Sequence, residues 1–191
     1  MNTKRKLIAL LAIATLISIV NASVFVYYPI TLTISPQNPP VVFLEGSNAG
    51  GNDLWGNTIT VNTGDGTSLT IEVHPTLQKN YYYNITEIKN NDSLHAYYIK
   101  FRVTEPITDS RVDEAYLIIN NTNTKVQHII KLKSGEVQPD DWIELGSSSK
   151  FRVDLYIVLN SVGSSSSITV RVDLIISTTN AESPPSTLPG E

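Results

Sequence analysis

Apolar and polar residues alternate with a period of two in segment after segment of this 191-residue chain. The pattern is clearest in residues 151–159 and 168–176, where every second residue is Phe, Val, Leu or Ile. A β-strand places successive side chains on opposite faces, so this alternation predicts strands that are buried on one face. After residue 22 the sequence shows no amphipathic helical run of useful length, which makes an all-β fold the expectation.

Eleven segments rich in Val, Ile, Tyr and Thr are predicted to be strands, with Gly, Asn, Asp, Pro and Ser between them. They are Val24–Ile34, Val41–Leu44, Thr58–Val61, Ser68–His74, Tyr82–Asn90, His95–Val103, Glu114–Asn120, Lys125–Lys133, Trp142–Leu145, Lys150–Leu159 and Ser167–Ser177. Many strands at such short spacing predict a jelly-roll-like antiparallel β-sandwich. The chain has no cysteine, so packing and strand pairing must hold this sandwich together without disulfides.

Three strand pairings are predicted from neighbouring segments. Residues 151–159 and 168–176 both contain Arg-Val-Asp-Leu, and as an antiparallel pair they would set Arg152 near Asp173 and Asp154 near Arg171 on a solvated face.

Tyr82–Asn90 and His95–Val103 read as a hairpin, because Asn and Asp in the intervening turn tolerate left-handed backbone. Gly64-Asp65-Gly66 predicts a further turn between two strands.

The N-terminus predicts a cleaved secretion signal. Lys4, Arg5 and Lys6 precede the uncharged run Leu7–Val20, and small residues then favour cleavage between Ala22 and Ser23. The apolar run is shorter than the roughly 20 residues that span a bilayer as a helix, so no membrane span is expected after the signal is removed. A pilin-type signal cut before the apolar run is the alternative, but the large Lys6 stands where a small residue is expected.

The predicted organisation has four parts. Residues 1–22 are the signal, 23–34 an N-terminal strand or arm, 35–179 the β-sandwich, and 180–191 a disordered tail rich in Pro and Ser. The location implied is secreted and extracellular. Removing the signal leaves 11 Lys and Arg against 18 Asp and Glu, which argues against a nucleic-acid partner, since such proteins need a basic face.

The side chains that carry chemistry form no catalytic or metal-binding pattern, and no cofactor is expected. His74, His95 and His128 fall in different strands. The adjacent acidic pairs Asp113-Glu114 and Asp140-Asp141 would point to opposite faces of a strand, which does not make an acid–base pair. The prediction is therefore that the chain is not an enzyme.

Two kinds of site remain open. The Gly-rich loop at 45–57 offers Asn48, Asn52 and Asp53 as oxygen ligands for calcium, although a plain loop is the favoured interpretation. Sequons for N-glycosylation occur at Asn84, Asn91 and Asn120, about the number that chance produces in so Asn-, Ser- and Thr-rich a chain. Asn91 and Asn120 are predicted to lie at accessible turns, and Asn84 within a strand.

The segment after the signal has two interpretations. Its even-numbered residues from Val24 to Ile34 are all Val, Tyr, Ile or Leu and share one face. Pro29 interrupts the hydrogen-bond ladder and divides the segment into an arm, Val24–Tyr28, and a following strand, Ile30–Ile34. The arm, made of Val24, Phe25, Val26, Tyr27 and Tyr28 with Pro29 as its hinge, can add a strand to a neighbouring subunit. Alternatively, Val24–Ile34 is the first strand of its own sandwich.

The mature sequence resembles secreted archaeal filament subunits, the donor-strand-linked pilins of bundling pili and threads, and through them the biofilm-matrix TasA group. The stretches that carry this resemblance are Val24–Pro29 directly after the signal, Pro39–Phe43 followed by Gly46–Gly50, Tyr83–Asp92, and Ile143–Gly146 before the strand Phe151–Leu159. The resemblance implies a head-to-tail homopolymer in which the arm completes the sheet of the next subunit. It also implies cell adhesion and other cell-surface filaments as partners.

A second hypothesis from another class is a monomeric cell-surface module that binds carbohydrate or protein. Its contacts would be made by exposed aromatic residues, with Trp55 and Tyr81–Tyr83 as the candidates. The two hypotheses differ in whether the segment after the signal pairs within its own domain or with a neighbour.

Overall fold

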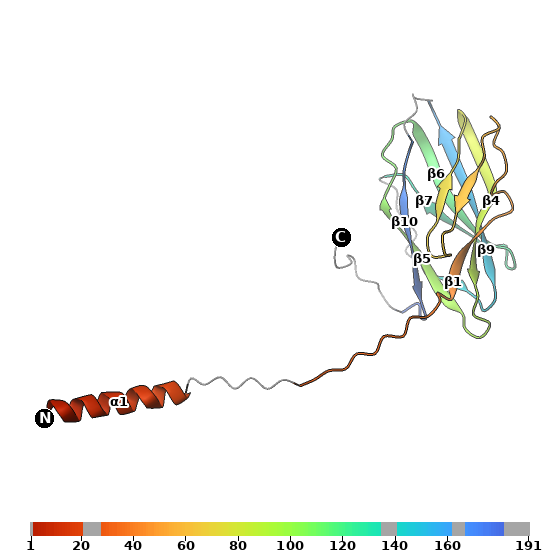
Figure 1. Ribbon diagram of the computed structural model, residues 1–191. Helices are drawn as coiled ribbons and strands as arrows, with labels where there is room; N and C mark the ends of the chain where they lie inside the picture. The colour runs from red at the N-terminus through yellow and green to blue at the C-terminus, as the bar shows by residue number, and fades with distance from the viewer. Residues whose placement is uncertain (1, 21–27, 135–140, 162–166, 182–191) are drawn as a thin grey trace. The chain divides into compact units, whose positions relative to one another are not determined.

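Figure 1 shows a computed structural model of the chain, which describes residues 2–20, 28–134, 141–161 and 167–181. It contains two compact units, Met1–Gln37 and Asn38–Glu191. The predicted cleavage site at Ala22 and Ser23 and the arm residues Val24–Tyr27 lie outside the described residues.

The first unit contains helix α1, Thr3–Val20, which covers the charged and apolar parts of the predicted signal. Among the described residues, no helix combines the length and apolar character needed to cross a membrane. Residues 28–37 of this unit are described but belong to neither a helix nor a strand.

The second unit contains ten strands, which overlap ten of the eleven predicted segments. They are β1 Val41–Glu45, β2 Thr60–Asn62, β3 Thr70–Glu72, β4 Gln78–Asn90, β5 Tyr97–Glu105, β6 Val112–Asn121, β7 Gln127–Lys131, β8 Ile143–Leu145, β9 Lys150–Leu159 and β10 Arg171–Ser177. The exception is Val24–Ile34, whose described part forms no strand.

The strands form an all-β antiparallel sandwich, as predicted. The larger sheet has the order β1-β4-β9-β6-β7, and the smaller sheet has the order β10-β5-β8. Strands β2 and β3 pair only with each other, joined by the predicted turn at Gly64-Asp65-Gly66. Buried residues from all three groups, among them Phe151, Ile99 and Val61, form one continuous core.

Two predicted pairings are wrong, because local alternation does not say which strand is the neighbour. β9 lies at the centre of the larger sheet, whereas β10 is an edge strand of the smaller sheet and pairs with β5. Asp173 therefore meets Arg102 at 2.7 Å, and Arg171 meets Glu105 at 3.0 Å. Strands β4 and β5 likewise lie in different sheets, so the turn between them crosses from one layer to the other.

The side chain of Asn90 stabilises the turn between β4 and β5. Its fully buried side chain donates from Nδ2 to the carbonyls of His95 at 2.8 Å, Gly146 at 3.0 Å and Leu145 at 3.4 Å, and its Oδ1 accepts from the Asp92 amide at 2.9 Å. One amide thus joins the end of β4, the crossing turn and the end of β8.

Asn90→Ala is expected to lower the free energy of unfolding by about 2–4 kcal/mol, because it leaves buried carbonyls without a donor. The matched control is Asn91→Ala, whose side chain is exposed and whose expected change is within about 0.5 kcal/mol. Urea unfolding of both variants measures the difference. Equal losses of unfolding free energy in the two variants would show that the hydrogen bonds of the Asn90 side chain do not hold β4, the turn and β8 together.

Candidate functional site

Residues 28–34 carry a row of apolar side chains with no cover. Tyr28, Ile30, Leu32 and Ile34 are each between 75% and 91% exposed. They alternate with Pro29, Thr31 and Thr33, the spacing that places all four on one face of an extended strand. We call these four side chains the apolar row. Contiguous exposed apolar side chains mark interaction sites.

A proline-rich connection follows the apolar row. Residues 35–40 read Ser-Pro-Gln-Asn-Pro-Pro, and the three prolines favour an extended, semi-rigid backbone. The carbonyl of Pro40 accepts a hydrogen bond from the amide of Asn91 at 2.7 Å, which anchors the start of β1. The predicted hinge, Pro29, lies within the row itself.

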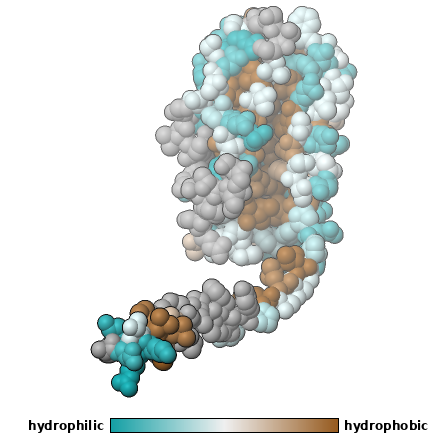
Figure 2. Space-filling view, turned by 60° about the vertical axis from the view of Figure 1, so that its left-hand side comes forward, coloured by the Kyte–Doolittle hydropathy of each residue, from teal (hydrophilic) through white to brown (hydrophobic). Residues whose placement is uncertain are grey.

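The second unit has an apolar strip on its surface. Figure 2 shows brown, apolar residues running along this unit between neutral and polar margins. Several inward-facing side chains are only half-buried although they pack against the core, among them Ile157 on β9, Ile71 on β3, and Val172 and Leu174 on β10. The second layer consists of a three-stranded sheet and a separate hairpin, with no described ladder between them, and these half-buried side chains show that apolar surface of the core stays open among the described residues.

The outer face of the larger sheet is organised around the buried carboxylate of Asp154. It accepts hydrogen bonds from the Tyr81 hydroxyl at 2.6 Å, the Asn84 amide at 2.7 Å, Asn120 Nδ2 at 2.8 Å, and both Nε and Nη2 of Arg152 at 3.0 Å. The register of β4 shifts here, between Tyr82 and Thr86, so Asp154 satisfies the irregular backbone. Asp154 was expected on a solvated face, but these partners enclose it completely.

The tyrosines of this face are also committed to internal contacts. Tyr116 and Tyr156 stack with ring centroids 5.8 Å apart, and Arg152 lies 4.2 Å above the ring of Tyr83. The Tyr83 hydroxyl accepts a hydrogen bond from Arg152 at 2.8 Å. Tyr81 and Tyr83, proposed above as sugar-binding aromatics, therefore have partners within the sheet.

Removing the Asp154 carboxylate is expected to destabilise the sandwich strongly. Asp154→Ala leaves the Arg152 charge and three other donors without their acceptor, so a loss of about 3–5 kcal/mol in unfolding free energy is expected. Asp113→Asn, an exposed carboxylate on β6, serves as the control with little change. Chemical denaturation of both proteins tests this, and a small effect for Asp154→Ala would contradict a central role.

The sequons differ in accessibility. Asn120 was predicted at an accessible turn, but it lies within β6, only 5% exposed, with its Nδ2 bound to Asp154. Asn84 lies in β4 as predicted, and its Nδ2 donates to Ser47 Oγ at 2.9 Å. Asn91 is exposed in the crossing turn, so it is the sequon with a free side chain to modify.

The histidines are dispersed, each with a different neighbour. His95 Nδ1 lies 2.8 Å from Asp92 Oδ2, and His74 Nδ1 lies 3.2 Å from Asp53 Oδ2. His128 is half-buried, and this burial lowers its pKa. Within the part of the chain that the structure describes, no three His, Asp or Glu side chains are grouped as metal ligands.

The loop proposed for calcium is closed by its own hydrogen bonds. Asp53 Oδ1 accepts from the amides of Trp55 at 2.8 Å and Asn57 at 2.9 Å, while Oδ2 faces His74. This carboxylate shapes the turn. Of the adjacent acidic pairs, Asp113 and Glu114 lie on β6, Asp141 is described, and Asp140 lies outside the described residues.

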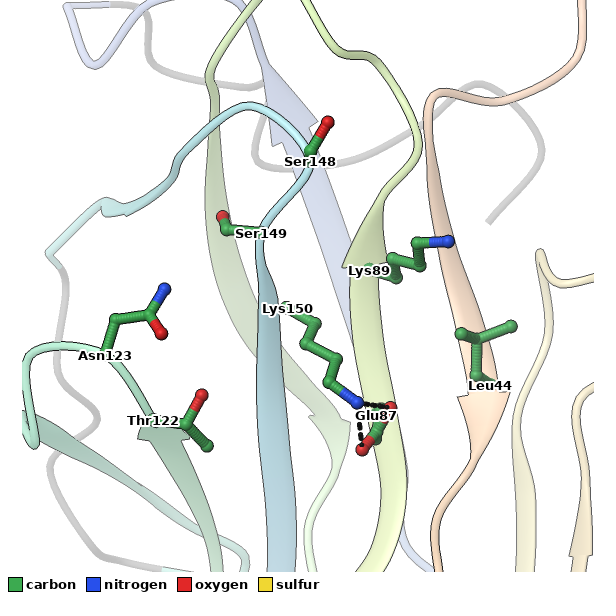
Figure 3. Close-up of a pocket in the computed structure, with 8 residues that line it drawn as sticks. All are labelled: Leu44, Glu87, Lys89, Thr122, Asn123, Ser148, Ser149 and Lys150. Atoms are coloured by element: carbon green, nitrogen blue, oxygen red, sulfur yellow. Dashed lines mark hydrogen bonds and ion pairs between the residues drawn. The ribbon is translucent and has the colours of Figure 1, made fainter.

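One surface hollow on the larger sheet has no catalytic arrangement among the residues that line it. It measures about 450 Å³ and is lined by Leu44, Glu87, Lys89, Thr122, Asn123, Ser148, Ser149 and Lys150 (Figure 3). Lys150 Nζ contacts both carboxylate oxygens of Glu87 at 2.9 Å, and Ser149 Oγ donates to the Gly146 carbonyl. The Ser149 hydroxyl is bonded to a backbone carbonyl, whereas a serine nucleophile needs a general base beside it.

The sequence matches no protein-family model and no curated protein.

Stability is expected to fall at alkaline pH. Burial raises the pKa of Tyr82 to about 12, and burial together with the Asp154 hydrogen bond raises the pKa of Tyr81 to about 12. Because the unfolded phenols ionise near pH 10, the stabilisation they contribute is complete below pH 10 and is lost as the pH rises toward 12.

The measurement is the urea midpoint between pH 8 and pH 11.5. Tyr82→Phe should flatten this decline, because it removes one of the two phenols whose pKa the fold raises. If the urea midpoint of Tyr82→Phe falls with pH as steeply as that of the unsubstituted protein, ionisation of Tyr82 does not contribute to the alkaline loss of stability.

Proposed function

We propose that this protein is a structural subunit of an extracellular filament, in which the N-terminal strand of one subunit pairs with the sandwich of the next. The observation that carries the proposal is the exposed apolar row, which has the side-chain spacing of a strand but no strand partner among the described ladders. Residues that alternate in this way gain main-chain hydrogen bonds and side-chain burial when they join an existing sheet.

In the sequence, the apolar alternation of the predicted arm continues into the apolar row. Val24 and Val26 have the same parity as Tyr28, Ile30, Leu32 and Ile34, so the donor segment extends past the predicted boundary at Tyr28. Burying each large apolar side chain contributes about 1.5–3 kcal/mol, so the four of the row contribute roughly 6–12 kcal/mol before ordering costs. Joints of this strength suit a polymer without disulfides.

A donor segment and an acceptor on each copy produce an open polymer. Such a head-to-tail contact uses two different surfaces and does not close on itself, so it extends into a filament. The predicted secretion signal places this assembly outside the cell, in line with the resemblance to archaeal pilins.

A second candidate is a monomeric surface module that binds a partner through the loop at 46–57. Leu54 and Trp55 at the tip of this loop are strongly exposed, which is the observation in its favour. Tyr81 and Tyr83 are 52% and 51% exposed, but their hydroxyls already bond Asp154 and Arg152, which favours the loop over the tyrosines as the contact surface.

The test uses paired substitutions on the two faces of the donor segment. Ile30→Asp with Leu32→Asp places charges on the apolar face and is expected to abolish polymers, because a buried, unpaired carboxylate is costly. Thr31→Asp with Thr33→Asp adds the same charge to the opposite face and should retain polymers. Negative-stain microscopy and gel filtration of the mature protein read out both variants.

If the unsubstituted mature protein is a stable monomer, the filament proposal fails and the binding module is favoured. Equal loss of polymers in both variants would show that net charge, rather than burial of the apolar row, controls assembly.

A further inference from the structure

We infer that the acceptor is the edge of β10 that faces away from β5 and pairs with no strand in the described ladders, where the incoming strand completes the smaller sheet between β10 and the β2–β3 hairpin. This inference rests on the proposed filament function and adds the surface that receives the donor segment. The occupant is the segment of a second copy that contains the apolar row.

The position of β8 shows which side of the smaller sheet is already covered. A small hollow is lined by residues 127–130 of β7, Asp141 and Ile143 beside and on β8, and Phe101 of β5. Just after β5, Ile107 forms a bridge with Lys133, beyond the end of β7. The β8 side of the smaller sheet therefore lies over β7, and β10 lies on the opposite side of β5.

The β2–β3 hairpin lies at the other end of the larger sheet. The Phe43 amide on β1 donates to the carbonyl of Gly66 in the hairpin turn at 2.8 Å, and the Gly50 amide just after β1 donates to Ile59 at 2.9 Å. Because β1 and β7 are opposite edges of the larger sheet, the order across the second layer is β8, β5, β10 and then the hairpin. No described ladder joins β10 to the hairpin.

The side chains of β10 leave apolar surface exposed at this edge. Ile176 pairs with Ile99 of β5 on the same face of the sheet, yet Ile176 is 39% exposed and Ile99 is 0% exposed. Val172 and Leu174, which share this face, are half-buried. An added strand beside β10 would cover these three side chains, as β10 covers those of β5.

The other described edges are less suited to the apolar row. At the outer edge of β1, the Phe43 amide already donates a hydrogen bond to the hairpin turn. At the other edge of the larger sheet, just beyond β7, Lys133 forms a bridge with Ile107. Strand β8 has only three residues, whereas β10 has seven, the length of residues 28–34.

Pro29 is compatible with an incoming strand whose backbone hydrogen bonds are made mainly to one neighbouring strand. Alternate residues of a strand direct their backbone groups to the same neighbour, so Tyr28, Ile30, Leu32 and Ile34 bond to one side and Pro29 faces the other. When the backbone groups of the four residues of the apolar row bond to β10, Pro29 faces the hairpin. Pro29 has no amide hydrogen to donate, and a proline is tolerated on a side of the strand that forms few ladder bonds.

Cysteine pairs test the inference, since the chain has no cysteine of its own. Thr31→Cys or Thr33→Cys on the donor segment is combined with Ile175→Cys, which points outward on β10. Two positions on the incoming strand, Thr31 and Thr33, are used because its register against β10 can differ by two residues. Side chains opposite each other in adjacent strands come within about 4.5–5.5 Å, close enough for a disulfide. Oxidised filaments should give a ladder of linked subunits on a non-reducing gel.

The matched control replaces Ile175→Cys with Ile129→Cys, an exposed isoleucine on edge strand β7, and should give no ladder. Two results would overturn β10 as the acceptor while leaving the filament function intact. In the first, filaments cross-link through Ile129→Cys. In the second, filaments form but neither Thr31→Cys nor Thr33→Cys cross-links to Ile175→Cys. A cross-link closed within one chain would show that the segment completes its own sheet. Absence of filaments in the unsubstituted mature protein would refute the proposed function, and the acceptor with it.

Discussion

The inner face of the five-stranded sheet must be covered by the second layer, and most of the architecture follows from that constraint. Strands β10, β5 and β8 cover one part of it, and the β2–β3 hairpin covers another. Between them, inward-facing residues such as Ile157 and Ile176 keep part of their surface in solvent. Apolar surface left in water at the centre of a sandwich favours a further strand, and residues 28–34 have the alternation that such a strand needs.

Two buried polar side chains hold this sandwich together without disulfides. Asp154 joins β4, β6 and β9 across the outer face, and Asn90 joins the two layers at one end. Both satisfy backbone groups that leave the regular ladders, and buried backbone groups rarely go unpaired in folded proteins. Their hydrogen bonds lie within the larger sheet and at the crossing turn, away from the proposed acceptor edge.

Local pattern predicted the strands well and their partners poorly. The alternation in residues 151–159 and 168–176 identified β9 and β10, but it also suggested that they form one hairpin. Alternation reports which face is buried, not which strand lies alongside, so the salt bridges expected between them are replaced by Arg102 with Asp173 and Glu105 with Arg171. For the same reason Asp154 and Asn120 looked like solvated residues, although the bulge of β4 brings them into one buried network.

The sequence by itself determined the all-β class, ten strand positions and the apolar alternation that continues from the predicted arm to Ile34, because a period of two is a local property of the chain. Only the tertiary structure decided how the strands divide between layers, that Asn90 and Asp154 are buried, and where the second layer is incomplete. These depend on contacts between residues far apart in the sequence, such as Phe43 with Gly66 and Asp154 with Asn84. The proposed donor segment could therefore be recognised in the sequence, whereas its proposed acceptor beside β10 could be recognised only from the arrangement of the layers.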